Sequence, residues 1–426
     1  METSDFDFEN LFSIFEKSIT NNIKQESYSD ILVAYSGGID STALLFFSKK
    51  FANKYNKNIK AIHINHNLNQ DAKSWELHCE NFCKKIEVKL IIKNIKIILN
   101  KSDSIEEKAR DARYKSIYEV MKKNTIMLTA HHLEDQSETF LHQLLRGAGV
   151  TGLSSMPVVK KIDQGFHIRP FLKLNKEAIY DIANYNNILY IEDSSNDDIK
   201  FSRNYIRKKI FPIIKKRWPG YSETISRSAY NLSESMKLND DLAEIDFQNF
   251  SMGEKNKINL DVKELDDYRF NNVIRFWIRN NNFRMPSSDQ LISIYKNVFE
   301  AGKDKTPFFS CNEYEIRRFN NYIEIMKPLT AHDPSKIYTW EFKKDLIISN
   351  LSINLSWENL EARLGFPVNT DVEVKFRKSG ENIQFKGSNK SLKDFMRENK
   401  IPPWQRERTL LTVSYTHLTL PTILLV

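Results

Sequence analysis

Short apolar runs alternate with longer segments of helical spacing through the first half of the chain. The apolar runs cover residues 31–35, 59–65, 88–94 and 125–130. The segments with helical spacing cover residues 40–54, 71–85, 105–122 and 134–145. Such alternation is typical of βαβ units on a parallel sheet. Because no segment repeats another in sequence, the pattern predicts an α/β domain rather than a repeat array.

The pattern changes twice in the second half. From about residue 221 to residue 300 the apolar positions keep helical spacing and strand signals are absent, which predicts a helical domain. Residues 306–327 then alternate and turn at Asn320–Asn321, as a β-hairpin does. Residues 337–355 and 371–413 have the pattern of a small, mostly β unit. The predicted parts are an α/β domain at 1–217, a helical domain at 218–335, a small C-terminal domain at 336–413 and an atypical tail at 414–426.

Composition restricts the class of protein. The 63 Lys and Arg against 55 Asp and Glu give a net charge of +8, which keeps nucleic acid among the candidate partners. Three scattered cysteines exclude a disulfide framework and fit a reducing compartment. The N-terminus has no basic region ahead of an apolar core, and no run of about 18 apolar residues offers a membrane span. These features predict a cytoplasmic protein.

The first candidate site is the loop "SGGIDS" at 36–41, between the first apolar run and the first helical segment. Ligands of parallel sheets bind where strands end and helices begin. Two adjacent glycines allow backbone N–H groups to approach an anion closely, and the helix adds its positive end. A carboxylate in such a loop can place Mg²⁺ beside phosphate. The predicted ATP-binding residues are Ser36, Gly37, Gly38, Ile39, Asp40 and Ser41, with Asp40 also a metal ligand.

Other interpretations of the glycine patterns are weaker. Asp40 could simply cap the helix that follows it. The chain contains no GxxxxGK[ST] sequence, which excludes a Walker P-loop. The stretch "GAGVTG" at 147–152 spells GxGxxG, but it follows a helical segment rather than a strand. We therefore interpret it as a loop and not as a dinucleotide site.

The loop at 36–41 resembles the SGGxDS loop of the PP-loop ATP-pyrophosphatases, which cleave ATP to AMP and pyrophosphate while they adenylate a substrate. Five further motifs follow in order: "HINHNL" (63–68), "EEKARDARY" (106–114), "AHHLEDQSETFLHQLLRGAGVTGL" (130–153), "RPFL" (169–172) and "EDSSNDDIKFSRNYIRKKIFP" (192–212). Together they are similar to the tRNA(Ile)-lysidine synthase family over residues 28–217. Residues 391–408 add a weaker match. After Leu411 the family pattern stops, so the tail is given no function.

The resemblance implies a ligase that forms a C–N bond in two steps. ATP adenylates the C2 oxygen of the wobble cytidine in a tRNA(Ile) with a CAU anticodon, and the ε-amine of free L-lysine then displaces AMP. The implied cofactors are ATP and Mg²⁺, and the helical and C-terminal domains would bind tRNA. The resemblance leaves open whether the protein forms a homodimer. Two other functions also stay open, a tRNA thiolase with the same loop and a catalytically idle tRNA-binding module.

The resemblance gives roles to charged residues of the helical segments. Asp135 and Glu138 are three residues apart and share a helix face, where paired acids suit the ammonium groups of lysine. Without the motif, the same pair would fit a solvated face that also carries Glu134. The implied catalytic residues are Asp40, Arg113, His132 and Arg203.

A basic segment at 200–217 carries no acid and interleaves aromatic residues with Lys and Arg. Such runs are usually solvated faces, but positive charge with aromatic rings also fits an RNA backbone and an unstacked base. Arg110 shares a helix face with Arg113, and Arg146 ends a helical segment, where it could simply favour the helix dipole. The predicted tRNA-binding residues are Arg110, Arg146, Arg207, Lys208 and Lys209.

Overall fold

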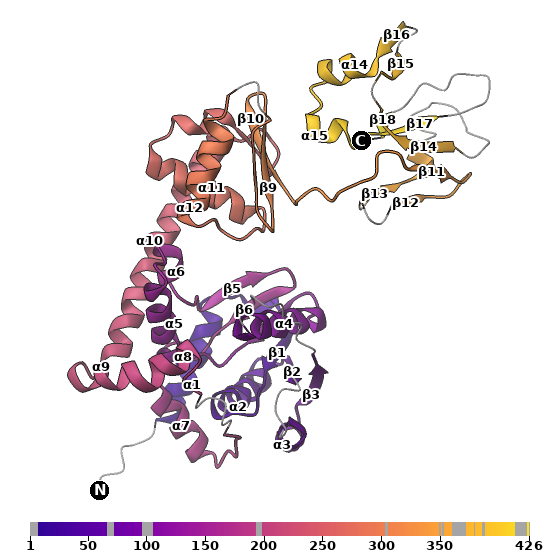
Figure 1. The fold of residues 1–426 in the computed structure, drawn as a ribbon. Coiled ribbons are helices and arrows are strands. Elements are labelled where there is room, and N and C mark those ends of the chain that lie inside the picture. The colour runs from indigo at the N-terminus through magenta and orange to yellow at the C-terminus, as the bar shows by residue number, and fades with distance from the viewer. Residues whose placement is uncertain are drawn as a thin grey trace. The chain divides into compact units, whose positions relative to one another are not determined.

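The computed structural model describes most of the chain. The described residues are 7–65, 72–95, 105–192, 198–302, 306–348, 351, 353–359, 372–378, 380–385, 388–413 and 424–425. They form two compact units, Met1–Asn239 and Asp240–Val426 (Figure 1). No helix in these ranges is long and apolar enough to cross a membrane.

The first unit is built on a six-stranded sheet with the order β3-β2-β1-β4-β6-β5. The strands are β1 (Asp30–Ala34), β2 (Asn58–Asn65), β3 (Lys89–Asn94), β4 (Thr125–Leu128), β5 (Val159–Ile162) and β6 (Gly165–Ile168). The central strand β1 runs parallel to both β2 and β4, and only β5 is antiparallel to its neighbour. The predicted parallel sheet is confirmed. Strands β5 and β6 were not predicted.

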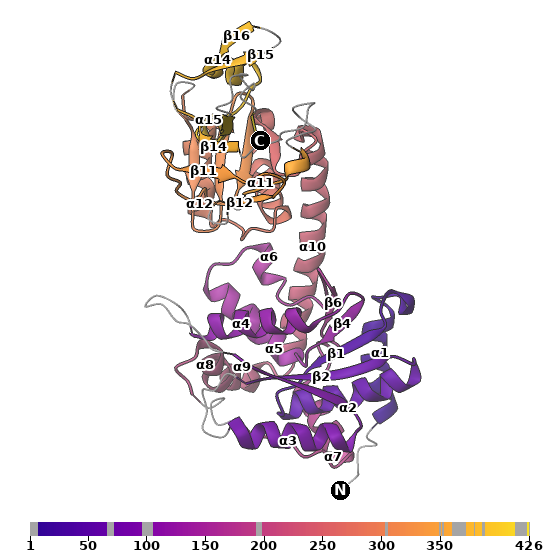
Figure 2. The same cartoon turned by 90° about the vertical axis from the view of Figure 1, so that its right-hand side faces the viewer.

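Helices cover both faces of this sheet (Figure 2). They are α1 (Phe8–Thr20), α2 (Ile39–Lys54), α3 (Ala72–Lys85), α4 (Ile105–Val120), α5 (Leu133–Leu145), α6 (Val150–Leu153) and α7 (Lys176–Tyr185). Side chains alternate along a strand, so Ile31 and Val33 pack against α1, α2 and α7, whereas Leu32 packs against α4. The four predicted helices are confirmed, and α1 and α7 were missed.

After the sheet, the chain passes through α8 (Ser202–Tyr205), one π turn η3 (Ile206–Ile210), α9 (Phe211–Arg217) and the long helix α10 (Tyr221–Phe250). The π turn is a local widening of the helix that often marks a functional site. The division between the two compact units falls within α10. The three-domain boundaries from the sequence remain predictions.

The second unit begins within α10 and contains the predicted helices α11 (Asp267–Asn280) and α12 (Ser288–Ile294) and a four-stranded sheet. Its strands are β7 (Lys257–Asn259), β8 (Phe308–Ser310), β9 (Glu315–Phe319) and β10 (Tyr322–Met326). The hairpin of β9 and β10 turns at Asn320, whose φ of 50° suits an asparagine. Strand β7 corrects the expectation of a purely helical stretch. Its three residues pair with β10 and are too short to give a pattern.

The C-terminal part is mostly β, as predicted. Its strands are β11 (Ile337–Trp340), β12 (Leu346–Ile348), β13 (Ile353–Leu355), β14 (Val372–Phe376), β15 (Asn382–Phe385), β16 (Ser388–Ser391), β17 (Leu410–Val413) and β18 (Leu424–Leu425), with helices α14 (Leu392–Glu398) and α15 (Pro403–Arg406). Trp340, Val374 and Phe376 are buried in its core. Apart from β18, the tail at 414–426 lies outside the described residues.

Candidate active site

The glycine loop connects β1 to α2 at the carboxyl end of the sheet. Gly37 has a φ of +90°, which side chains rarely adopt. A Cβ at this position would lie 2.8 Å from Cδ1 of Ile191 and 3.0 Å from Sγ of Cys79. The conformation therefore favours glycine at position 37, and a larger residue would also have to displace the Ile191 and Cys79 side chains.

Hydroxyl groups fix the shape of this loop. Oγ of Ser41 accepts from the Ser36 N–H at 3.2 Å and lies 3.0 Å from the Gly38 carbonyl oxygen. The Thr42 hydroxyl donates to the same carbonyl at 2.8 Å. Because Gly38 is the N-cap of α2, the first N–H groups of the helix have no partners within it. The loop is thus a preformed site for an anion such as phosphate.

Asp40 lies in the first turn of α2, at the edge of this loop. Its Oδ1 is buried and makes no hydrogen bond among the described residues. Burial raises the pKa of its carboxyl group; His132 and Lys176 oppose this rise, and Asp135 adds to it. A buried carboxylate oxygen without a partner is costly unless a ligand completes it. Mg²⁺ prefers such an oxygen ligand.

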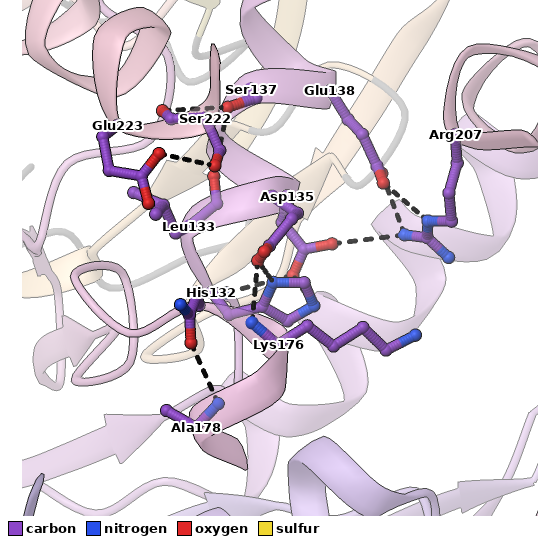
Figure 3. A network of polar contacts seen from close by, with 12 residues as sticks. His132, Leu133, Asp135, Ser137, Glu138, Lys176, Ala178, Arg207, Ser222 and Glu223 are labelled. Atoms are coloured by element: carbon purple, nitrogen blue, oxygen red, sulfur yellow. Dashed lines mark hydrogen bonds and ion pairs between the residues drawn. The ribbon is translucent and has the colours of Figure 1, made fainter. Parts of the chain in front are cut away.

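His132 follows β4 and caps the N-terminus of α5. Its Nδ1 is 2.9 Å from Oε2 of Glu134, and its Nε2 is 3.4 Å from Oδ2 of Asp135 (Figure 3). Its backbone N–H donates to the same Asp135 oxygen at 3.1 Å. Burial lowers the pKa of His132, but Asp135, Glu134 and Asp40 outweigh burial and raise this pKa to about 9. The imidazole is therefore protonated at neutral pH and links the loop to the acids of α5.

This charge makes stability depend on pH. The folded pKa of about 9 lies above the ordinary 6.5, so the stability from His132 is complete below pH 6.5 and is lost as the pH rises through about 9. We expect the free energy of unfolding of the wild type to fall by about 1–3 kcal/mol from roughly pH 6 to pH 10 because His132 loses its proton. In His132→Asn the free energy of unfolding should fall by that much less over the same range. Urea unfolding over that pH range measures both proteins. Parallel pH profiles would contradict the assignment.

Asp135 and Glu138 lie on one face of α5, as predicted, and both contact Arg207 of η3 (Figure 3). The Arg207 guanidinium donates to Oε1 and Oε2 of Glu138 at 2.5 and 2.9 Å and to Oδ1 of Asp135 at 3.3 Å. Burial disfavours this charge, but Glu138 and Asp135 raise the pKa of Arg207. Burial alone would raise the pKa of Asp135, but His132 and Arg207 hold it below its ordinary value.

The structure thus places Arg207, predicted to contact tRNA, against the two acids predicted to hold lysine. Only 1% of the Glu138 side chain is exposed, against 17% for Asp135 and 36% for Arg207. Asp135 is therefore the more accessible acid. Glu138 serves mainly to hold the guanidinium.

The other predicted site residues lie on several elements. Arg110 and Arg113 lie on α4, and the Arg110 guanidinium stands 5.7 Å from the ring centre of Tyr114. Arg203 lies on α8, and its charge adds to the effect of burial, which lowers the pKa of His131 between β4 and α5. Arg146 is exposed at the C-terminus of α5. Lys208 and Lys209 follow Arg207 and are both exposed.

Sequence reasoning missed two members of the site. Glu134 was named only in the alternative of a solvated face and was given no role, but its Oε2 contacts His132 and accepts from the Lys176 N–H at 3.0 Å. Lys176, at the start of α7, lies 42 residues along the chain from Glu134 and affects the pKa of Asp40. The N-cap position of His132 was the available signal for Glu134. No sequence pattern connects Lys176 to the loop.

Comparison with known families covers all three parts of the chain. A model of the PP-loop domain matches residues 11–214, where the sheet and the glycine loop lie. A model of the TilS substrate binding domain matches residues 261–323, and a model of the TilS substrate C-terminal domain matches residues 372–418. These matches confirm the predicted fold class and the resemblance based on the sequence motifs.

Full-length relatives agree. The tRNA(Ile)-lysidine synthase of Coxiella burnetii is 37% identical over 392 residues, covering 90% of this chain and 86% of that protein. The enzyme of Legionella pneumophila strain Lens is 33% identical over 91% of this chain and 89% of its own. That of Escherichia coli O157:H7 is 31% identical, with 92% of each chain covered. The chain therefore belongs to the tRNA(Ile)-lysidine synthase family.

Proposed function

We propose that this protein converts the wobble cytidine of a tRNA(Ile) with a CAU anticodon to lysidine. In the first step the cytidine C2 oxygen attacks the α-phosphate of ATP, and pyrophosphate leaves. In the second step the ε-amine of free lysine attacks C2, the C2–O bond breaks, AMP leaves with the oxygen, and the amine loses a proton. The observation that carries the proposal is one site that joins the phosphate loop to Asp40, His132 and the acid pair of α5.

ATP and Mg²⁺ fit the first part of this site. The loop at 36–41 would hold the phosphates with its hydroxyls and with the N-terminal N–H groups of α2. Asp40 would ligate Mg²⁺ through its unpartnered Oδ1. No group of three His, Cys, Asp or Glu among the described residues could hold a metal unaided. The ion would therefore take its other ligands from the nucleotide and water, and it would neutralise charge on the phosphates.

Lysine fits the second part. Asp135 offers a partly exposed carboxylate for a substrate ammonium group, and Glu138 anchors Arg207 beside it. Lysine would replace the longer of the guanidinium contacts, the one of 3.3 Å to Asp135. The reaction is proposed to take place in the cytoplasm, where tRNA, ATP and lysine meet.

The anticodon loop would lie along α8, η3 and α9. Lys208, Lys209 and Lys215 are exposed there, as are the rings of Phe201 and Tyr205. Exposed cations beside exposed rings suit a phosphate backbone and bases turned out of their stack. Arg203, Arg110, Arg113 and Arg146 are proposed as further RNA contacts, with Arg113 and Arg203 nearest the chemistry.

Charge reversal tests this surface. Lys208→Glu with Lys209→Glu should weaken tRNA binding and lower the slope of log affinity against log salt by about two, because each lysine releases counterions when it contacts a phosphate. Affinity for ATP should be unchanged. The matched control is Lys122→Glu with Lys123→Glu. These two adjacent lysines are exposed just before β4, at the amino end of the strand and away from the glycine loop. Filter binding over a salt series measures the slope for both double variants. Equal slopes would show that Lys208 and Lys209 do not contact phosphate.

The function is tested by AMP release from ATP with and without tRNA and lysine, followed by mass analysis of the digested tRNA. Lysidine synthesis requires both substrates and adds the mass of lysine, less water, to one cytidine. A thiolase would require a sulfur donor instead. Cys79 and Cys83 disfavour that alternative, because both are buried and burial raises the pKa of each thiol to about 12. An idle tRNA-binding module would release no AMP.

A further inference from the structure

A second polar cluster lies on the face of the sheet that α4 covers. It consists of Thr129 and His131, which follow β4, together with His167 in β6 and Arg169 just after β6. Oγ1 of Thr129 is 2.9 Å from Nδ1 of His131 and 2.8 Å from Nε2 of His167. Nδ1 of His167 in turn lies 3.3 Å from NH2 of Arg169. Thr129, His167 and Arg169 are buried, and His131 is partly exposed.

The direction of each hydrogen bond follows from the arginine. A guanidinium only donates, so Nδ1 of His167 accepts and Nε2 of His167 carries the hydrogen. That hydrogen is donated to the Thr129 hydroxyl. The Thr129 hydrogen must then be donated to Nδ1 of His131, because a buried hydroxyl that accepts twice would leave its own hydrogen unpaired. His131 therefore carries its hydrogen on Nε2.

Both imidazoles are neutral. Burial and the neighbouring Arg169 charge lower the pKa of His167 to about 2. Burial, with Arg169, lowers the pKa of His131 to about 3 against the opposing charge of Asp135. His131 thus differs from its neighbour His132, which faces the acids and is charged. The two adjacent histidines differ because His131 contacts Thr129, whereas His132 contacts Glu134 and Asp135.

The His131 side chain is half-exposed and adjoins His132 of the proposed site. Within the described residues, its Nε2 makes no hydrogen bond. Charges of Asp135, Arg110 and Arg203 all act on this ring, which places it between the lysine site and the arginines proposed to contact RNA. The arginines would attract phosphate. A neutral N–H donor among them is suited to an uncharged acceptor.

We propose that His131 donates its Nε2–H to N3 of the target cytosine, and that Thr129, His167 and Arg169 are positioning residues that fix this tautomer. The inference rests on the proposed lysidine reaction. A donor at this edge withdraws electron density from C2, which favours attack by the lysine amine, and it selects pyrimidines that present an acceptor there. Because the ring is neutral, it adds no repulsion to the nearby arginines.

Substitution of Thr129 tests the relay. Thr129→Val removes the hydroxyl at nearly constant volume and should slow single-turnover lysidine formation by about tenfold or more. Thr129→Ser keeps the hydroxyl and should restore most of the rate. The matched control is Thr125→Val on the same strand, since the buried Thr125 hydroxyl has no partner. Affinity for ATP should not change in any of the three, because the hydrogen bonds of Thr129 go to His131 and His167 and not to the loop at 36–41.

Substitution of His131 tests the donor itself. Glutamine places an amide N–H near the position of Nε2, whereas asparagine reaches only that of Nδ1. We expect His131→Asn to lose about a hundredfold in rate and His131→Gln to retain most of it. Nitrogen-15 NMR of full-length enzyme with labelled histidine can report the tautomer of His131, whose signals are assigned by their loss in His131→Gln. We expect the Nε2–H tautomer in wild type and in Thr129→Ser, and a mixture of tautomers in Thr129→Val.

The outcomes separate the two proposals. If wild type forms no lysidine, the proposed function fails, whatever the NMR spectrum shows. If wild type is active but His131 carries its hydrogen on Nδ1, or is charged, the relay is wrong. It is equally wrong if Thr129→Val is as fast as Thr125→Val, or if His131→Asn is as fast as His131→Gln. Should Thr129→Val fail to fold, the His131 pair and the wild-type spectrum decide.

Discussion

Asp40→Asn is expected to abolish AMP formation, with a loss of at least about a thousandfold in the adenylation rate. Asp40 is the only acid of the loop at 36–41, and its buried Oδ1 has no partner among the described residues. The amide keeps the shape of the side chain but removes the charge that a magnesium ion needs. Both steps should stop together, since the second requires the product of the first.

The same variant should fold at least as well as wild type. Burial and the nearby Asp135 raise the pKa of Asp40, which means that its negative charge destabilises the folded protein. Removing the charge therefore leaves the free energy of unfolding unchanged or higher. Asp163→Asn, in the exposed turn between β5 and β6, is the matched control and should retain full activity. Near-normal adenylation by folded Asp40→Asn would remove Asp40 from the nucleotide site.

The sheet could be predicted from sequence where its pattern was strong. The buried strand β1 and the glycines after it are adjacent in the chain, so one short stretch predicted a strand, a turn and a helix N-terminus. Strands β5 and β6 have four residues each and half-exposed patterns, which are too short for alternation to be recognised. Helix α1 has a clear apolar face of Phe12, Phe15 and Ile19. This segment was considered only as a possible signal peptide and was not tested for helical spacing.

The candidate site was predictable where it depends on local spacing. Asp135 and Glu138 had to share a face because they are three apart on one helix. Their pairing with Arg207 spans 69 residues and is created by the fold, and the uniform basic run at 200–217 gave no reason to single out one arginine. In the same way, the different charges of His131 and His132 depend on their partners, which are Thr129 for His131 and two acids for His132.

The acid pair of α5 should act after the base has been activated. Asp135→Asn or Glu138→Gln removes a negative charge from the proposed lysine site and leaves the hydrogen bonds within the loop at 36–41 in place. Losing one charge-assisted contact costs about 1.5–3 kcal/mol, which is about ten- to a hundredfold in apparent lysine affinity. Asp135→Asn should weaken lysine directly, and Glu138→Gln should do so by releasing Arg207.

The double variant should therefore accumulate adenylated tRNA and fail in the second step. Arg207 is 36% exposed, so water can solvate its charge when both acids are lost and the protein should still fold. The test follows label from α-labelled ATP on tRNA, without and then with excess lysine. Glu177→Gln, an exposed acid of α7, is the control. In wild type and the control, lysine should discharge the label as AMP, whereas in the double variant the label should remain on RNA. If adenylation itself disappears in folded protein, Asp135 and Glu138 serve the ATP or magnesium site, because only a role before the first bond forms would stop the label from reaching the RNA.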